Sequence, residues 1–260
     1  MTTATANLDR IQLETNAPVA RLTLRNPPVN ILDIPLMDEL SSALAEIEAD
    51  PKISMIVIEG AGKCFSAGVD VAAHTPDQVS AMLEKFHRII RALVATRKIT
   101  IAAVHGHCLG GGAELAMVCD IVISTDDASW GFPEITLGCY PPVAVTALSA
   151  LIGQKRASEL VLTGRTISGT EAANIGLASA AVPPNGLLES VNGTLHRLEK
   201  LSSAALAMTK KSLYAWDSIH FDKGLARAEK IYLEELMRTE DSQEGIRAFL
   251  EKRSPRWTGK

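Results

Sequence analysis

Two glutamates stand where they could share acid–base chemistry. Glu114 follows three consecutive glycines at the start of a segment of good helix formers, and Glu134 follows a proline in the apolar stretch WGFPEITLG. Two carboxyls beside one substrate can serve as general base and general acid when their surroundings give them different pKa values. A structural role is open for both, because the helix dipole favours an acidic residue in a first turn. Neither glutamate alone distinguishes a catalytic role from a structural one.

Two segments of small residues offer bare backbone to a ligand. Glycine costs about 0.5 to 1 kcal/mol relative to alanine inside regular structure, so the run at 110–112 needs a reason. The run is explained either by a tight entry into the next helix or by close approach of a ligand to the main chain. The second segment is KCFSAGVD, residues 63–70.

Short β-branched runs and helical patterns place these segments in a fold. The runs predict strands at 11–15, 19–24, 55–60, 101–106 and 121–126. Apolar periodicity predicts helices over 35–50, starting near Asp33, and 75–96, with Thr75 as cap and Pro76 as the first helical residue. The three candidate segments each follow a strand, and open α/β sheets bind ligands at the carboxyl ends of strands.

The chain becomes helical from about Pro142. Three segments there end at glycines, as helix C-termini do, and residues 178–183 read as a last short strand. The remainder reads as helices at 186–200, 203–217, 222–238 and 241–252. We therefore predict a core over 1–185 and a helical extension over 186–260.

Composition narrows the classes of protein. The chain has 260 residues, a net charge of −4 and 47% apolar residues, which is typical of a globular protein. Four scattered cysteines and the lack of a signal or membrane segment predict the reducing cytoplasm and no membrane contact. The few clustered cations are expected on solvated helix faces, and contact with the phosphates of a nucleotide-bearing ligand is the alternative; they are Lys210, Lys211, Lys252, Arg253 and Arg256. Their small number argues against a nucleic-acid partner.

Familiar site motifs are missing from the sequence. EGAGKCF at 59–65 lacks the first glycine and the hydroxyl residue of a phosphate loop, and no G-x-G-x-x-G or G-x-S-x-G motif occurs. Six histidines lack the spacing of zinc ligands, so no metal is expected and a structural or solvent-facing role is favoured for each.

The combination of motifs resembles the crotonase superfamily, the enoyl-CoA hydratase/isomerase family, over essentially the whole chain. The matching segments are LTLRNPPVNIL, FSAGVD, AAVHGHCLGGGAELAMVCDIVIS and FPEITLG. The resemblance implies an α/β crotonase (ClpP/crotonase-like) fold of ββα units, with sheets arranged perpendicularly. It also implies a C-terminal helical region that packs on a neighbouring subunit in a homotrimer or homohexamer.

The resemblance also assigns the site. It implies an oxyanion hole in which the main-chain N–H groups of Val69 and Gly111 hold the thioester oxygen of an acyl-CoA, near a helix that begins at about Ala113. Family hydratases carry both glutamates, with Glu114 the main base toward water and Glu134 the acid toward Cα. The remaining substrate contacts implied are Ala67, Gly68, Asp70, Val71, Gly110, Trp130, Phe132, Pro141 and Pro142.

The same resemblance bears on protonation and on coenzyme A. The apolar neighbours Trp130, Phe132 and Ile135 are expected to favour a protonated Glu134. Coenzyme A is part of the substrate, is expected along 25–30 and 67–71, and no cofactor is implied.

One departure from the family pattern concerns the acyl group. After PEITLG the chain reads LGCYPPVAVTALSALIG, with Pro142, Val143, Ala144 and Val145 in place of the usual glycines. This replacement predicts a differently shaped, more apolar acyl pocket. Together with FSAGVDVAAHTPD, the loop sequence resembles that of hydratases acting on cyclic dienoyl-CoA thioesters. The alternatives are an isomerase, a ring-opening hydrolase, or a non-catalytic protein that binds coenzyme A or RNA.

Overall fold

The computed structural model describes residues 4–75, 77–214 and 218–259. A seven-stranded sheet has the order β1-β2-β3-β4-β5-β7-β10, antiparallel from β1 to β3 and parallel from β3 to β10. A three-stranded sheet has the order β6-β8-β9. The strands are β1 (Ala4–Asn7), β2 (Ile11–Asn16), β3 (Val19–Leu24), β4 (Met55–Gly60), β5 (Ile99–Val104), β6 (His107–Leu109), β7 (Ile121–Thr125), β8 (Ser129–Gly131), β9 (Thr166–Ser168) and β10 (Ala180–Val182).

Helices cover both faces of the large sheet. The α-helices are α1 (Ile34–Ala49), α2 (Val79–Ala95), α3 (Gly111–Met117), α4 (Pro142–Ile152), α5 (Gln154–Thr163), α6 (Gly169–Asn174), α7 (Leu187–Glu199), α8 (Ser203–Tyr214), α9 (Ser218–Glu234) and α10 (Glu240–Leu250). Four 3₁₀ helices are also described: η1 (Val71–His74), η2 (Pro133–Leu137), η3 (Pro184–Gly186) and η4 (Leu236–Arg238).

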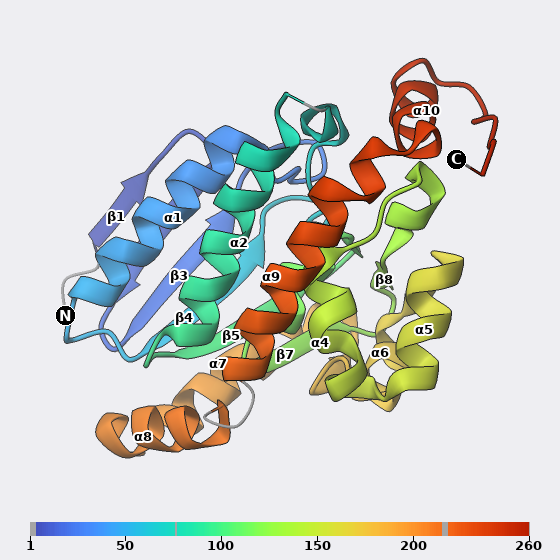
Figure 1. Ribbon diagram of the computed structural model, residues 1–260. Helices are drawn as coiled ribbons and strands as arrows, with labels where there is room; N and C mark the ends of the chain where they lie inside the picture. The colour runs from blue at the N-terminus through green and yellow to red at the C-terminus, as the bar shows by residue number, and fades with distance from the viewer. Residues whose placement is uncertain (1–3, 76, 215–217, 260) are drawn as a thin grey trace.

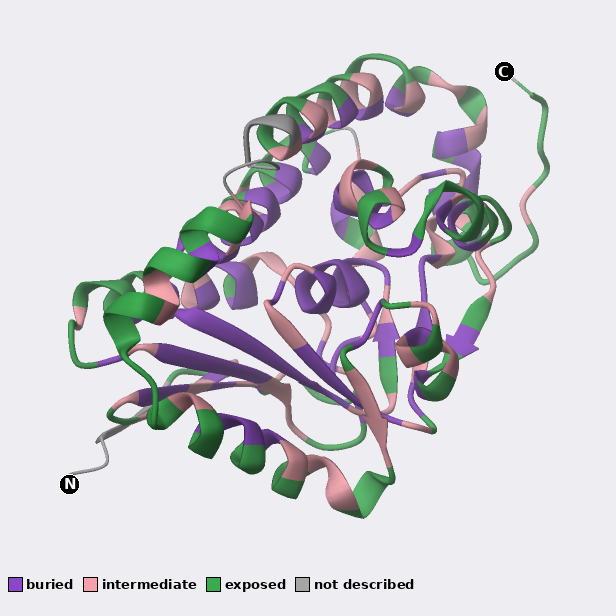
Figure 2. Ribbon diagram, turned by 90° about the horizontal axis from the view of Figure 1, so that it is seen from below, coloured by how far each residue is buried: buried purple, intermediate pink, exposed green. Residues whose placement is uncertain are grey.

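Alternate residues of the central strands pack on opposite layers. Ile56 and Ile58 of β4 belong to the large apolar core on the side of α1 and α2, whereas Met55 and Val57 pack with Val191 of α7. Figure 1 shows α1 and α2 side by side, with α9 next to α2, and Figure 2 shows buried strands between helices whose outer faces are exposed. Burial on both faces explains why these strands read as continuous apolar runs.

The five predicted strands, the last short strand and the helix over 35–50 are confirmed. The side chain of Asp33 accepts a hydrogen bond of 2.9 Å from the amide of Leu36 and so caps α1. The strands β1, β6, β8 and β9 were not predicted, because three or four residues are too few to show an alternating pattern.

One predicted helix start is wrong. Helix α2 begins at Val79 and has no side-chain cap, because the preceding residues form η1, which the side chain of Asp70 caps. Thr75 ends η1, and its hydroxyl has no partner among the described residues. Pro76, expected as the first helical residue, lies outside the described residues. Helix α3 begins at Gly111, within two residues of the start expected near Ala113.

The C-terminal helices pack on the core of their own chain. Helix α9 contacts α2 and α4, and α10 contacts η1 and η2. The division at residue 185 and packing on a neighbouring subunit remain predictions. Within the residues that the structure describes, no helix is both long and apolar enough to cross a membrane.

One cation expected on a solvated face is buried. Lys210 is 5% exposed, and its Nζ lies 2.8 Å from Oδ2 of Asp120 and donates to the carbonyl of Lys98 at 2.9 Å. The expectation was wrong because α8 packs against β5, which places Lys210 over Asp120. Lys211 and the three cations near the C-terminus are exposed, as expected.

Candidate active site

Three segments of chain are joined at the carboxyl ends of the central strands. The amide of Leu32 donates to the carbonyl of Gly68 at 2.9 Å, and the amide of Leu109 donates to the carbonyl of Ser66 at 3.0 Å. The segment after β4 therefore lies between the segment before α1 and the segment after β5. Asn30 fixes the turn beside it, because its buried side chain donates to the carbonyls of Ala61 and Cys64 at 2.9 and 2.8 Å.

Each glycine of the run packs against something that leaves no room for a side chain. A Cβ on Gly110 would lie 2.5 Å from Oε1 of Glu134, and one on Gly111 would lie 2.5 Å from Cγ2 of Val69. A Cβ on Gly112 would lie 2.7 Å from the carbonyl oxygen of Ser66. Gly110 also has φ +51°, a conformation that side chains of L-residues disfavour. The run thus serves both the turn into α3 and close approach at the site.

The main-chain N–H groups of Val69 and Gly111 lie on adjacent segments. A Cβ on Gly111 would be 3.4 Å from the nitrogen of Val69, and one on Gly68 would be 3.7 Å from the nitrogen of Gly111. Neither N–H donates to an acceptor within the described part of the chain. Both residues line a cavity of about 440 Å³. Main-chain donors without protein acceptors are almost always paired with a ligand or water when they are buried, so these two are free to bind a ligand oxygen.

Glu114 is held by the first turn of α4. Its side chain is 2% exposed, and Oε1 accepts hydrogen bonds from the amides of Val143 and Ala144 at 2.8 and 2.9 Å. Burial raises the pKa of Glu114 to about 7, and the two donated hydrogen bonds oppose this by stabilising the carboxylate. Glu114 is thus positioned and partly stabilised as an anion.

Glu134 faces the same cavity with an unsatisfied oxygen. It lies in η2 directly after Pro133, and its buried Oε2 has no hydrogen-bond partner among the described residues. Burial and then the charge of Glu114 raise the pKa of Glu134 to about 8. Because Glu114 has two N–H donors and Glu134 does not, a single proton on the pair resides mainly on Glu134. The arrangement provides one base and one acid at neutral pH.

Most of the predicted site residues line this one cavity. They are Ala67, Gly68, Val69, Asp70, Val71, Gly110, Gly111, Glu114, Glu134, Pro141 and Pro142. Of the loop residues expected to shape the acyl pocket, Val143 and Ala144 instead give their amides to Glu114, and Val145 is 43% exposed.

Trp130 and Phe132 do not line the cavity, so the structure gives no support to their prediction as substrate contacts. Both are fully buried, and the indole nitrogen of Trp130 donates to Oγ of Ser124 at 3.0 Å. Trp130 lies in β8, between β6 and β9, and Phe132 follows directly after this strand as the N-cap of η2; both rings are buried in the core. Ile135, expected to shield Glu134, is 37% exposed.

Several residues of the cavity wall were not identified from the sequence. They are Ile31, Ala72, His74, Met82, Leu83, Phe86, Pro133, Thr136, Leu137, Cys139, Tyr140, Tyr232, Phe249 and Leu250. The apolar stripe of α2 gave no sign that part of it faces a ligand space rather than core. Tyr232 and Phe249 come from α9 and α10, and only the tertiary fold brings these helices to the site.

Known proteins match this chain in sequence and in structure. The Enoyl-CoA hydratase/isomerase family matches residues 14–260. A protein of Mycobacterium bovis named "Probable enoyl-CoA hydratase" is 37% identical, over 96% of this chain and 98% of its own. The cyclohexa-1,5-dienecarbonyl-CoA hydratase of Thauera aromatica is 33% identical, over 95% of this chain and 96% of its own. The crystal structure of an enoyl-CoA hydratase from Mycobacterium avium subsp. paratuberculosis superposes with a TM-score of 0.88 at 26% identity, over 97% of this chain and all of the other.

The chain therefore belongs to the enoyl-CoA hydratase/isomerase family, the family within the crotonase superfamily that its sequence resembles. The relatives named as hydratases support the identification of this protein as an enoyl-CoA hydratase.

Proposed function

We propose that the protein adds water reversibly across the conjugated double bond of an enoyl-CoA, using Glu114 and Glu134 as base and acid. The observation that carries the proposal is that one cavity holds two free N–H donors and two carboxyls in different surroundings: Glu114 accepts two N–H hydrogen bonds, and the buried Oε2 of Glu134 accepts none. An addition of water needs both kinds of group, because one proton must leave the water and another must reach the substrate.

In the forward direction, the oxygen of water attacks Cβ and gives a proton to the carboxylate of Glu114. The electrons of the double bond move toward the thioester oxygen, and the acyl group becomes an enolate with its negative charge on that oxygen. Glu134 then delivers its proton to Cα, and the electrons return from the oxygen. The product gains one water, and the proton taken by Glu114 restores the pair by passing to Glu134.

The enolate oxygen is the atom that the N–H groups of Val69 and Gly111 bind in this proposal. Negative charge grows on that oxygen in the transition state, so fixed donors stabilise the transition state more than the ground state. One such donor contributes about 2.7 to 4 kcal/mol in enzymes where it has been removed. No cofactor takes part, and the coenzyme A portion of the substrate follows residues 67–71 and 25–30.

The acyl group that we propose is a cyclic dienoyl group of the cyclohexa-1,5-diene-1-carbonyl type. Support comes from the relative of that name in Thauera aromatica and from the compact wall formed by Pro141, Pro142, Tyr140 and Tyr232. A flat ring has no long tail, so it needs width near the carboxyls rather than a deep tunnel.

The test compares crotonyl-CoA with cyclohexa-1,5-diene-1-carbonyl-CoA as substrates of the purified protein. Loss of the enoyl-thioester absorbance and a product heavier by one water with its ring intact are expected, with the higher kcat/KM for the cyclic substrate. A product of unchanged mass would instead indicate an isomerase, and an opened ring a hydrolase. The acid–base assignment requires that Glu114→Gln and Glu134→Gln each lower kcat by about 10²-fold or more. Activity that survives both substitutions contradicts it.

We further propose a cytoplasmic homotrimer or homohexamer without a nucleic-acid or membrane partner. The four cysteines are buried and unpaired, as a reducing compartment allows. Light scattering of the purified protein measures the assembly, and a monomer would contradict this proposal.

A further inference from the structure

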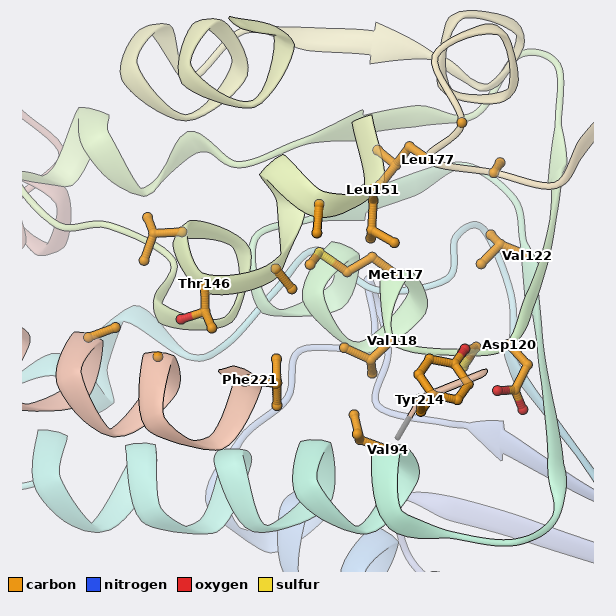
Figure 3. A pocket seen from close by; sticks show the side chains of 18 of the residues that line it. Val94, Met117, Val118, Asp120, Val122, Thr146, Leu151, Leu177, Tyr214 and Phe221 are labelled. Atoms are coloured by element: carbon orange, nitrogen blue, oxygen red, sulfur yellow. The ribbon is translucent and has the colours of Figure 1, made fainter. Parts of the chain in front are cut away.

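A second, larger cavity lies behind the wall of the candidate active site. It has a volume of about 1000 Å³ and is lined mainly by apolar side chains of α2, α3, α4 and α9. Figure 3 shows Val94, Met117, Val118, Leu151 and Phe221 around this space. None of the residues proposed for catalysis lines it.

Tyr140 is the one described residue that lines both cavities. It immediately precedes Pro141 and Pro142, which line the catalytic cavity, and is three residues before Val143, whose amide holds Glu114. Helix α9 also borders both cavities, because it contributes Ala228 to the second cavity and Tyr232 to the catalytic cavity. Tyr140 thus lies at the boundary of both spaces, and we refer to its side chain as the partition.

The partition is fixed at both its hydroxyl and its ring. The hydroxyl of Tyr140 donates to the carbonyl of Ala228 at 2.6 Å, which ties the start of α4 to α9. Its ring meets the ring of Tyr232 edge-to-face, with 5.2 Å between centroids and an interplanar angle of 78°. Aromatic pairs with this geometry are favourable beyond their simple burial of area. A side chain held in this way resists displacement by an acyl tail.

We propose that Tyr140 determines the length of the acyl group by closing the catalytic cavity against the second one. The proposal rests on the proposed function and deepens it, because it restricts the substrates to short or compact acyl groups. Removal of the ring joins the 440 Å³ cavity to the 1000 Å³ cavity, which then accepts the apolar tail of a long acyl chain. In a hydrophobic pocket a single methylene changes kcat/KM by about tenfold or more, so a tail of several methylenes is a sensitive probe.

The experiment measures kcat/KM for crotonyl-CoA and for trans-2-decenoyl-CoA in four proteins: the wild type, Tyr140→Phe, Tyr140→Ala, and Tyr140→Ala combined with Ala147→Phe. The wild type is expected to prefer the short substrate, and Tyr140→Phe to keep that ratio because the ring remains. Tyr140→Ala should raise the decenoyl-to-crotonyl ratio at least about tenfold. The double variant should reduce this gain, because Ala147 lines the second cavity and a phenyl group there obstructs part of it.

Binding of the saturated thioesters butanoyl-CoA and decanoyl-CoA, measured by calorimetry, follows chain length without any turnover. If the wild type hydrates no enoyl-CoA but Tyr140→Ala shifts the ratio of these two Kd values toward decanoyl-CoA, the hydratase proposal fails and the role of Tyr140 stands. If Tyr140→Ala does not fold, Tyr140→Val serves as the second opening variant. Equal preference for both chain lengths in the wild type, or an unchanged ratio in the folded opening variants, overturns the proposal.

Discussion

A methyl group at residue 110 is predicted to displace the proposed acid. In Gly110→Ala the new Cβ would lie 2.5 Å from Oε1 of Glu134, whereas ordinary van der Waals contact begins near 3.4 Å. The carboxyl must therefore retreat by about 1 Å, and a displacement of that size from productive geometry typically costs about 10²-fold in rate. We expect kcat for crotonyl-CoA hydration to fall about 10²-fold.

The same substitution also strains the backbone, and a matched control separates the two effects. Gly110 has φ +51°, and a non-glycine residue held in a sparsely populated conformation costs about 1 to 3 kcal/mol. Gly153 has φ +83° with no atom within 4 Å of the Cβ position, and it lines neither cavity. Gly153→Ala should therefore lose stability by a similar amount while keeping the wild-type kcat.

The assay follows the loss of enoyl-thioester absorbance, and thermal unfolding of each variant is measured in parallel. A Gly110→Ala protein that is destabilised like Gly153→Ala, yet hydrates crotonyl-CoA within threefold of the wild-type rate, would refute the proposed position of Glu134.

Three further outcomes follow from the buried charges. Because the pKa of Glu114 is raised to about 7 and that of Glu134 to about 8, the form with one proton on the pair is most abundant between these values, and a profile of kcat/KM against pH should peak there and fall on both sides. The pKa of Glu134 lies above its ordinary value, so the free energy of unfolding falls as the pH rises from about 4.5 to about 8 and this carboxyl loses its proton in the folded protein. In thermal unfolding, Glu134→Gln should therefore match the wild type near pH 4.5 and be more stable than the wild type at pH 8.5. An equal dependence of stability on pH in both proteins would contradict this. Lys210→Met leaves Asp120 buried without its cation and should lower the unfolding free energy by about 3 to 5 kcal/mol in denaturant titrations, with kcat unchanged; a cost below about 1 kcal/mol would show that the pair is solvated.

The sequence predicted the elements and failed at their junctions. Long apolar patterns located the central strands and α1, because period and length are local properties. The sequence predicted that α2 starts after Thr75, because a proline follows this residue. In the structure Asp70 instead caps the short helix η1, which ends at Thr75, and α2 starts only at Val79. The family pattern placed Glu114, Glu134, Val69 and Gly111, and the fold brings all four to one cavity.

The sequence by itself determined that two carboxyls and two segments of small residues follow consecutive strands, because the order of the strands and the residue types can be read directly from the chain. The sequence also favoured a protonated Glu134, but only the tertiary structure shows what keeps Glu114 ionised, because the N–H groups that stabilise it come from α4, 29 and 30 residues away. The tertiary structure also buries Trp130 and Phe132 in the hydrophobic core and places Tyr140 and Tyr232 in the cavity wall. Such assignments depend on which surfaces meet, and contacts between distant segments leave no periodic signal in the sequence.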